Sequence, residues 1–266
     1  MGEAIAGGLV GASDGVAAQL SAADFVIADP GEARREHLAA RYGFSCVADG
    51  REVDAADVVL LAVKPQVMMG VLEQLSENPA FSGGADGPLF ISIAAGLATS
   101  KLEAALPPDS RLVRAMPNTP LLVARGATAL ARGARATEDD LAFACGLFSC
   151  LGIAQAVDED ALDAVGAVSG SGPAYVAALV EALRDGGVKE GLDAALAERL
   201  ALQTVLGTAE LMLRTGDSPE KTRIAVCSPG GSTLAALAAM EEGGFSASLE
   251  AGVAAAVRRS KELGQC

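Results

Sequence analysis

The chain has 266 residues and a formal net charge of −14, and 51% of its residues are hydrophobic while only 3% are aromatic. This length suits two modest domains or one large domain with a core of Ala, Leu and Val. The negative charge argues against nucleic acid and anionic membranes as partners, because both carry phosphates that would be repelled. The sequence contains no run of roughly 18 apolar residues that could span a bilayer.

Reactive and metal-binding side chains are scarce. The five cysteines are widely spaced without a CxxC pair, and His37 is the only histidine. We therefore expect neither a disulfide framework nor a metal site, and one histidine excludes most Ser-His, Cys-His and His-metal chemistries. Unpaired cysteines fit a cytoplasmic protein, and the first residues lack the positive segment of a signal peptide.

The first part of the chain alternates strand patterns with helix patterns. Residues 57–63 form a continuous apolar run, typical of a strand buried on both faces of a parallel sheet, and Pro65 then opens a helix. Such alternation predicts a doubly wound, Rossmann-like sheet with room for an antiparallel edge. The expected strands are 24–29, 44–48, 57–63, 89–94, 111–116, 126–131 and 153–157, and the other expected helices are 1–12, 32–42, 100–106 and 138–149.

Strand patterns stop after Asp158, and only helix patterns follow. Residues 192–216 are apolar nearly all round, so this helix should be buried, and in so small a domain we expect it to pack against a second subunit. The chain is therefore predicted to divide into an α/β domain, 1–157, and an all-helical domain, 158–266. The expected helices of the second domain are 159–168, 173–185, 193–214, 232–242 and 246–262.

The start of the chain matches part of a dinucleotide-binding pattern. Such folds have a strand, a glycine-rich turn and a helix whose N-terminus holds pyrophosphate. Here Gly2 stands at the start of a helix with no strand before it, and Asp29 ends the next strand, where a ribose-binding acid normally falls. A dinucleotide fold entered after its first turn and a chain that simply begins with a helix explain this spacing equally well.

Three further motifs are ambiguous when each is taken alone. Val63-Lys64-Pro65 closes an apolar strand, where ligands bind in open α/β sheets, but a solvated Lys explains it more simply. Residues 169–173 (SGSGP) are either an anion-binding nest or a kinked turn between helices. Residues 228–233 (SPGGST) either hold a carboxylate at a helix N-terminus or provide Ser232 or Thr233 as an N-cap.

In six segments with a shared order and spacing, the chain resembles pyrroline-5-carboxylate reductases. The most specific are SGSGPAY and SPGGST. Members of that family reduce the cyclic imine 1-pyrroline-5-carboxylate to proline with NAD(P)H, which is the last step of proline biosynthesis. The resemblance implies a Rossmann-like domain and an all-α dimerisation and substrate domain. The six segments are AVKPQ (62–66), SIAAGL (92–97), RAMPNTP (114–120), VSGSGPAYV (168–176), SPGGST (228–233) and AAAVRRSKELG (254–264).

The resemblance also implies a set of site residues. Thr233 matches the hydroxyl that hydrogen-bonds the ring nitrogen, and it is the expected catalytic residue. The substrate carboxylate is assigned, across a homodimer, to Ser228, Gly230, Gly231, Ser232 and Thr233. NAD or NADP is assigned to Met1, Gly2, Asp29, Asp49, Ala62, Val63, Lys64, Pro65, Ile93, Ala94, Ala95 and Asn118.

Two acids depart from the family pattern. Asp29 stands where Ser or Asn is common, and Asp49 where Asn is common. An acid at the first position would bond a ribose 2′-OH and repel a 2′-phosphate. Arg34 and Arg35 could offset that charge, so the pattern favours NADH and leaves NADPH open.

The family has a strand and a G-x-G-N turn ahead of the residue that Met1 matches. We hypothesise that translation begins upstream, and we expect the in-frame DNA to encode a short apolar strand ending in GxGN. A stop codon there would contradict the hypothesis. A chain that truly starts at Met1 should bind cofactor weakly and have poor activity.

Two other functions fit parts of the sequence. One is a catalytically impaired dimeric binding or scaffold protein that has kept the helical domain. The other is a different NAD(P)-dependent dehydrogenase with the same two-domain plan, such as a 3-hydroxyacid dehydrogenase. Such enzymes usually need a catalytic Lys in the interdomain helix, and residues 158–181 contain none, which counts against this alternative.

Overall fold

The computed structural model describes residues 1–81 and 83–264 and divides them into two compact units. The α/β unit comprises Met1–Ser171 and the segment from Ala256 onward, and the helical unit comprises Gly172–Ala255. The expected division into domains 1–157 and 158–266 stays a prediction. The first described element is helix α1 (Gly2–Val10).

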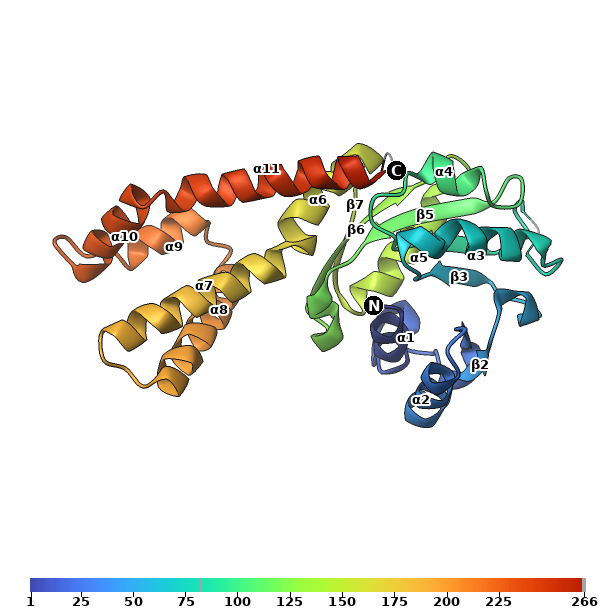
Figure 1. Cartoon of the computed structure of the whole chain (residues 1–266), viewed down its shortest axis with the longest axis horizontal. Helices are drawn as coiled ribbons and strands as arrows, with labels where there is room; N and C mark the ends of the chain where they lie inside the picture. Colours follow the sequence, from blue (N-terminus) through green and yellow to red (C-terminus); the bar gives the residue numbers. More distant parts are fainter. Residues whose placement is uncertain (82, 265–266) are drawn as a thin grey trace. The chain divides into compact units, whose positions relative to one another are not determined.

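The strands of the α/β unit form two sheets (Figure 1). The larger has five strands in the order β3-β4-β5-β6-β7, and the smaller pairs β1 with β2 in parallel. Strands β3, β4 and β5 are mutually parallel, whereas β6 is antiparallel to β5 and parallel to β7. The strands are β1 (Val26–Ala28), β2 (Ser45–Val47), β3 (Val58–Leu61), β4 (Leu89–Ser92), β5 (Arg111–Met116), β6 (Gly126–Arg132) and β7 (Gly152–Ala156).

Local sequence signals fix the ends of several helices. Pro65 occupies the first turn of α3, where its missing N–H is not needed. Gly43 ends α2 with a φ of 77°, a left-handed conformation that glycine adopts without strain. Thr137 and Asp140 form a capping box at the start of α5. The helices of this unit are α1 (Gly2–Val10), α2 (Glu32–Tyr42), α3 (Pro65–Glu77), α4 (Thr99–Glu103), α5 (Glu138–Ser149) and α6 (Leu162–Val165).

Strand β4 is buried on both faces of the sheet, and its alternating side chains enter two separate cores. Leu89 and Ile91 belong to a core with residues of α1 and α5. Phe90 belongs to a second core with residues of α3 and α4. Helices therefore cover both faces of the larger sheet, and the predicted doubly wound, Rossmann-like class is confirmed.

The structure differs from the predicted pattern at β3 and after β7. Strand β3 is only partly buried, because among the described residues it pairs with β4 alone. The helix expected at 159–168 is split into a 3-10 turn η5 (Glu159–Ala161), α6 and a π-helix η6 (Gly166–Gly170). A short helix, α9 (Pro219–Ala225), was not expected, since seven residues are too few to show a clear helical period.

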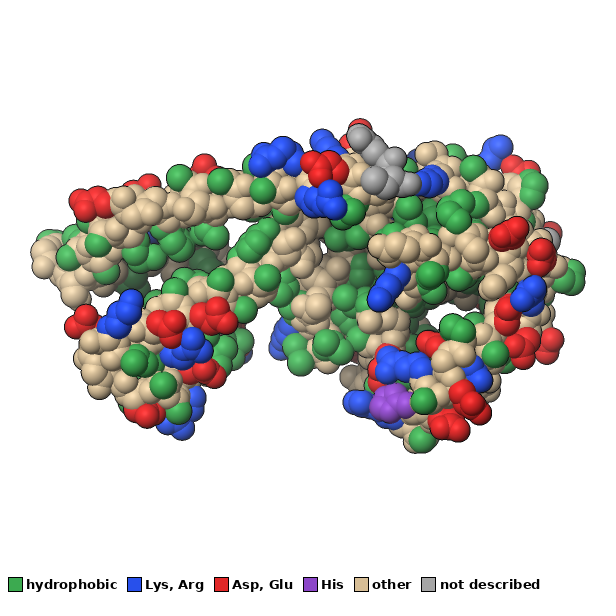
Figure 2. Space-filling view, viewed as in Figure 1, with side chains coloured by type: hydrophobic (Ala, Val, Ile, Leu, Met, Phe, Trp, Pro, Cys, Tyr) green, Lys and Arg blue, Asp and Glu red, His purple; other side chains and the backbone are tan. Residues whose placement is uncertain are grey.

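The helical unit buries few of its apolar side chains within one chain. It consists of α7 (Gly172–Lys189), α8 (Ala194–Thr215), α9, α10 (Ser232–Glu242) and most of α11 (Phe245–Gly264). Its buried residues include Val180, Ala197 and Ala201, whereas Leu206 and Leu213 of α8 are 60% and 85% exposed. Apolar side chains lie along the surface of these helices (Figure 2). So much apolar surface indicates a protein interface.

Among the described residues, no helix is long and apolar enough to cross a membrane.

Candidate functional site

The ends of three parallel strands bring several predicted cofactor residues to one edge of the sheet. Leu61 of β3 pairs with Ser92 of β4, and Ser92 pairs with Arg114 of β5. Because these strands run in the same direction, the segments that follow them leave from the same edge. They contain residues 62–65, 93–95 and 118. In open α/β sheets, ligands bind at this edge.

The first turn of α1 lies against the segment that follows β3. A Cβ atom placed on Gly2 would lie 3.0 Å from the Cβ of Ala62, so a larger residue at either position would force these elements apart. Met1 is 47% exposed, and its carbonyl accepts a hydrogen bond from the amide of Ile5. The first amide groups of a helix lack intrahelical acceptors and attract anions. The small Gly2 therefore lets the first turn of α1 pack closely on this strand end.

Val63, Lys64 and Pro65 complete this strand end. Val63 and Pro65 are half-buried, and the exposed Lys64 is the N-cap residue of α3 with an extended backbone. The side chain of Lys64 is therefore accessible to solvent at the edge of the sheet.

Asp29 follows β1 and is held by its own turn. Its Oδ1 atom accepts a hydrogen bond from the amide of Gly31 at 2.8 Å, and its carbonyl accepts one from Arg35 Nη1 at 2.8 Å. Arg34 is instead paired with Glu3 of α1 at 2.5 Å. Of the two arginines that could offset the charge of Asp29, Arg34 is therefore engaged by Glu3, whereas Arg35 is held beside Asp29.

Glu3 gathers several side chains of α2. It accepts hydrogen bonds from Arg34 and Tyr42, and it lies 3.1 Å from His37 Nε2. Burial by itself raises the pKa of Glu3, but the hydrogen bonds from His37 and Arg34 outweigh it and bring the pKa below its ordinary value. This cluster, which joins α1 to α2, was not anticipated from the sequence.

Asp49 caps the 3-10 turn η3 (Gly50–Glu52). Its carboxylate accepts hydrogen bonds from the side chain and the amide of Arg51, with Nη2 to Oδ2 at 2.7 Å. These contacts hold the pKa of Asp49 below its ordinary value. The carboxylate therefore has a local structural role, whatever it does toward a cofactor.

The loop after β4 combines buried and exposed residues. Ala94 and Leu97 are buried in the sheet core, Ile93 is half-buried, and Ala95 is exposed. Gly96 has a φ of 75°, and its carbonyl oxygen would lie 2.7 Å from a Cβ placed on Gly264 at the end of α11. Only glycine at 264 allows this close approach.

A carboxylate from η5 closes the end of the same loop. Glu159 Oε1 accepts a hydrogen bond from the amide of Thr99 at 2.7 Å, and the Thr99 hydroxyl donates to the other oxygen. Arg114 Nη1 donates to Oε1 at 3.1 Å, and the side chain of Arg114 is only 9% exposed. Sequence reasoning missed Glu159. The available signal was Arg114, which stands between apolar residues within a predicted strand, because a charge that is buried there needs a partner.

Hydrogen bonds from Thr99 and Arg114 lower the pKa of Glu159. Burial alone would raise it, but the hydrogen bonds and the charge of Arg114 more than compensate. The carboxylate is therefore held in its ionised form.

Asn118 bridges two segments of the α/β unit. Its Nδ2 donates to the carbonyl of Ser169 at 3.0 Å, and its Oδ1 accepts from the amide of Ala127 at 2.8 Å. The side chain, in a residue only 8% exposed, thus links the loop after β5 to β6 and to η6. The geometry supports a role in shaping the loop.

The SGSGP segment begins within the π-helix η6. A Cβ on Gly166 or Gly170 would lie 2.9 Å or 3.1 Å from the terminal methyl of Met116, so glycine allows close packing there. The hydroxyl of Ser169 donates to the carbonyl of Val165 at 3.0 Å. These contacts favour the kinked-turn interpretation of the segment.

The SPGGST loop lies in the helical unit, directly before α10. Gly230 has a φ of 70°, and Gly231 is the N-cap residue of α10. A Cβ on Gly231 would lie 2.4 Å from the Oγ and 3.1 Å from the carbonyl oxygen of Ser228, so the loop is tightly packed here. No side chain among the described residues caps α10, so the alternative in which Ser232 or Thr233 is the N-cap is wrong. Ser232 is exposed and Thr233 half-buried in its first turn.

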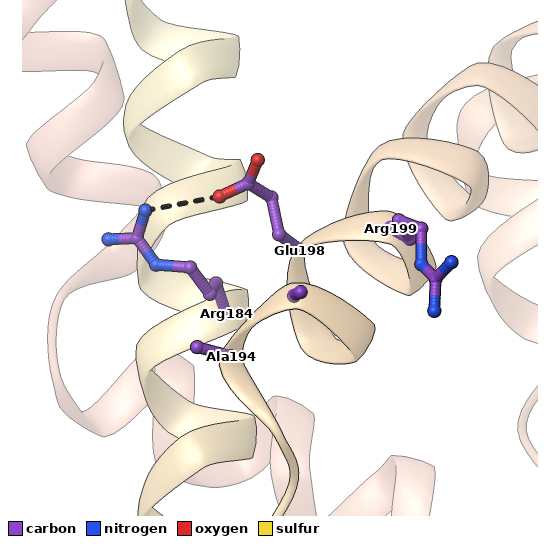
Figure 3. Close-up of a pocket in the computed structure, with 5 residues that line it drawn as sticks. Arg184, Ala194, Glu198 and Arg199 are labelled. Atoms are coloured by element: carbon purple, nitrogen blue, oxygen red, sulfur yellow. Dashed lines mark hydrogen bonds and ion pairs between the residues drawn. The ribbon is translucent and has the colours of Figure 1, made fainter.

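A surface hollow in the helical unit lies elsewhere, at the turn between α7 and α8 (Figure 3). It is lined by Arg184, Ala194, Ala195, Glu198 and Arg199, and Arg184 lies 3.5 Å from Glu198. None of these residues was predicted to bind a ligand. Among the described residues, no cluster of His, Cys, Asp and Glu could hold a metal ion.

The fold and the strand-end segments define a two-part chain of the Rossmann-like, dinucleotide-binding class. Residues 159–263 match the family model of pyrroline-5-carboxylate reductase dimerisation, and residues 1–96 match that of NADP oxidoreductase, coenzyme F420-dependent. The pyrroline-5-carboxylate reductase of Synechocystis is 46% identical over 91% of this chain and 88% of its own length. That of Escherichia coli is 35% identical over 99% and 94%.

Solved structures agree with this likeness. The pyrroline-5-carboxylate reductase of Coxiella burnetii has a TM-score of 0.87 at 34% identity, covering 98% of this chain and 95% of its own. The Plasmodium falciparum pyrroline carboxylate reductase, solved with NADP bound, has a TM-score of 0.84 at 30% identity, covering 99% and 94%. The chain belongs to the pyrroline-5-carboxylate reductase family.

The lowered pKa of Glu159 predicts how stability depends on pH. A carboxylate whose pKa is lower in the folded state stabilises the fold above its ordinary value of 4.5. That contribution disappears as the pH falls through the lowered pKa. We expect Glu159→Gln to lower the free energy of unfolding by about 1–2 kcal/mol at neutral pH and by less in acid. Urea unfolding at pH 7 and at about pH 3 would measure this difference; an equal loss at both pH values would contradict it.

Proposed function

We propose that this chain is a pyrroline-5-carboxylate reductase, which reduces 1-pyrroline-5-carboxylate to L-proline with NAD(P)H in the last step of proline biosynthesis. Its membership of the family, over nearly the whole of both chains, carries this conclusion. The Rossmann-like unit and the helical unit fit the two tasks of binding a dinucleotide and holding a small acid. The bound nicotinamide supplies the hydride.

The α/β unit would hold the cofactor at the carboxyl edge of its parallel strands. Gly2 packs the first turn of α1 closely against Ala62 at this edge, and the amide groups of that turn would bind the pyrophosphate. We assign the rest of the cofactor contacts to residues around this edge and at the ends of β1 and β2: Met1, Asp29, Asp49, Val63, Lys64, Pro65, Ile93, Ala94, Ala95 and Asn118. Asp29 would accept a hydrogen bond from the ribose.

The substrate carboxylate would bind at the N-terminus of α10. Because Gly231 is the N-cap residue and no described side chain caps the helix, its first amide groups are available to an anion. We assign this task to Ser228, Gly230, Gly231, Ser232 and Thr233. The hydroxyl of Thr233 would hydrogen-bond the ring nitrogen and orient the imine.

The reaction makes modest demands on the protein. A protonated imine is already electrophilic, so reduction requires a well-placed hydride donor and a fixed ring rather than a strong acid or a nucleophile. Proximity and orientation are the main contributions of the protein. This agrees with a sequence that has one histidine.

The protein functions as a homodimer formed through the helical unit. The exposed apolar face of α8 supports this assembly, because leaving it in water would be costly. We further propose that the protein is cytoplasmic, in agreement with its widely spaced cysteines.

An assay of nucleotide oxidation with pyrroline-5-carboxylate tests the activity and the role of Thr233. The purified protein should oxidise NADH or NADPH only when the imine is present. Thr233→Val should lower kcat/KM by about tenfold or more, because the ring nitrogen loses its hydrogen bond. Thr233→Ser, which keeps a hydroxyl, should retain most of the activity. Loss of activity in both variants would contradict a hydrogen-bonding role, and an inactive wild-type protein would favour the scaffold alternative.

The dimer is tested by placing a charge on α8. Leu206→Asp should prevent association, because a carboxylate would have to be buried without a partner. Val67→Asp is the control. It likewise places a carboxylate at an exposed apolar position, here Val67 of α3, which is 54% exposed, and it should leave the dimer intact. Sedimentation velocity would distinguish the two. A Leu206→Asp protein that still sediments as a dimer would place the interface elsewhere.

A further inference from the structure

The loop after β4, residues 93–98, has anchors on both sides of an exposed tip. Before the tip, Ser92 is paired in the sheet and Ala94 is buried. After it, Leu97 is buried and Thr99 begins α4. Ala95 at the tip stays exposed. Ala95, which is proposed to contact the cofactor, therefore lies on a short segment that is held at both ends.

Thr99 is held by a charged residue from a distant part of the chain. Glu159 accepts hydrogen bonds from both the amide and the hydroxyl of Thr99, and its 2.7 Å contact with the amide is short. Arg114 completes the cluster from β5, directly beside the end of β4. Three donors therefore converge on one partly buried carboxylate, and hydrogen bonds to an ionised acceptor are stronger and more directional than neutral ones.

The segment that carries Glu159 is itself fixed within the α/β unit. Ser260 of α11 donates a hydrogen bond to Asp163 at 2.6 Å, which ties the final turns of α11 to α6. The end of α11 also touches the loop, where Gly264 meets the carbonyl of Gly96. The chain leaves the α/β unit after Ser171 and returns at Ala256. Both connecting segments therefore hold the loop after β4.

We propose that Glu159 is a positioning residue for hydride transfer, which fixes the loop 93–98 through Thr99 and so sets the position of the nicotinamide. This inference rests on the proposed function. Glu159 does not need to touch the substrate. Its carboxylate acts through the start of α4, so its loss would displace the loop while the substrate-binding segment 228–233 stays intact. An ångström of misplacement is enough to slow a transfer that depends on close approach.

The test compares four variants of the full-length protein. Glu159→Gln removes the charge but keeps the shape of the side chain. Thr99→Val removes the hydroxyl that donates to Glu159, whereas Thr99→Ser keeps a hydroxyl. These two variants therefore test the Thr99–Glu159 hydrogen bond by changing its donor. Asp140→Asn is the matched control, because it weakens another ion pair of β5, the one with Arg111 at the start of the strand, which does not contact the loop.

Nucleotide affinity, kcat, both KM values and the primary deuterium isotope effect on hydride transfer are measured. In Glu159→Gln and Thr99→Val, kcat should fall and the Kd of the nucleotide should rise, each by about tenfold. The isotope effect should increase, while the KM for pyrroline-5-carboxylate changes by less than about twofold. Thr99→Ser should resemble the wild type. Asp140→Asn should lower stability but leave the kinetic constants unchanged.

Two results would overturn the proposal. One is wild-type kinetics in both Glu159→Gln and Thr99→Val. The other is an equal kinetic loss in Asp140→Asn, which would indicate a general effect of stability. Should Glu159→Gln fail to fold, the comparison of Thr99→Val with Thr99→Ser decides the matter. An inactive wild-type protein would instead reject the proposed function, and the nucleotide Kd values would still test Glu159 without turnover.

Discussion

The burial of β4 on both faces is the constraint on which the α/β unit depends. All four of its residues are buried, and alternate side chains enter separate cores with α1 and α5 on one face and α3 and α4 on the other. Burying each large apolar side chain contributes about 1.5–3 kcal/mol. A sheet with two apolar faces needs helices on both, and the parallel strands then end along one edge. The position of the cofactor site therefore follows from the way the core is covered.

Polar contacts then fix what hydrophobic burial leaves undetermined. Arg111, the first residue of β5, and Arg114 within the strand are paired with Asp140 and Glu159. Buried ion pairs add little net stability, because desolvation offsets much of their attraction, but they tolerate few alternative geometries. The first pair fixes the start of α5. The second fixes the loop that is proposed to face the nicotinamide.

The helical unit differs from the α/β unit in how it buries its apolar side chains. Its helices bury few side chains within one chain, and α8 leaves leucines exposed along its length. A partner subunit removes this surface from water. The proposed substrate loop belongs to this same unit, so the dimer interface and the proposed substrate site share one set of helices.

Much of this architecture could be predicted because its signals are local. Apolar periodicity located nearly all strands and helices, and Pro65 marked the start of α3. The family resemblance, confirmed by the comparisons, rests on short motifs of this kind. The SPGGST motif likewise includes Gly231, although only the structure shows how closely Gly231 approaches Ser228.

Contacts between distant segments could not be predicted in this way. The sequence by itself determined the order of the elements, the fold class and the family, because these depend on residue type and spacing. Only the tertiary structure decided that Glu159 meets Thr99, that Arg34 pairs with Glu3, and that β3 is half-exposed. These facts depend on which surfaces meet after the chain has folded, and a partner sixty residues away leaves no local pattern.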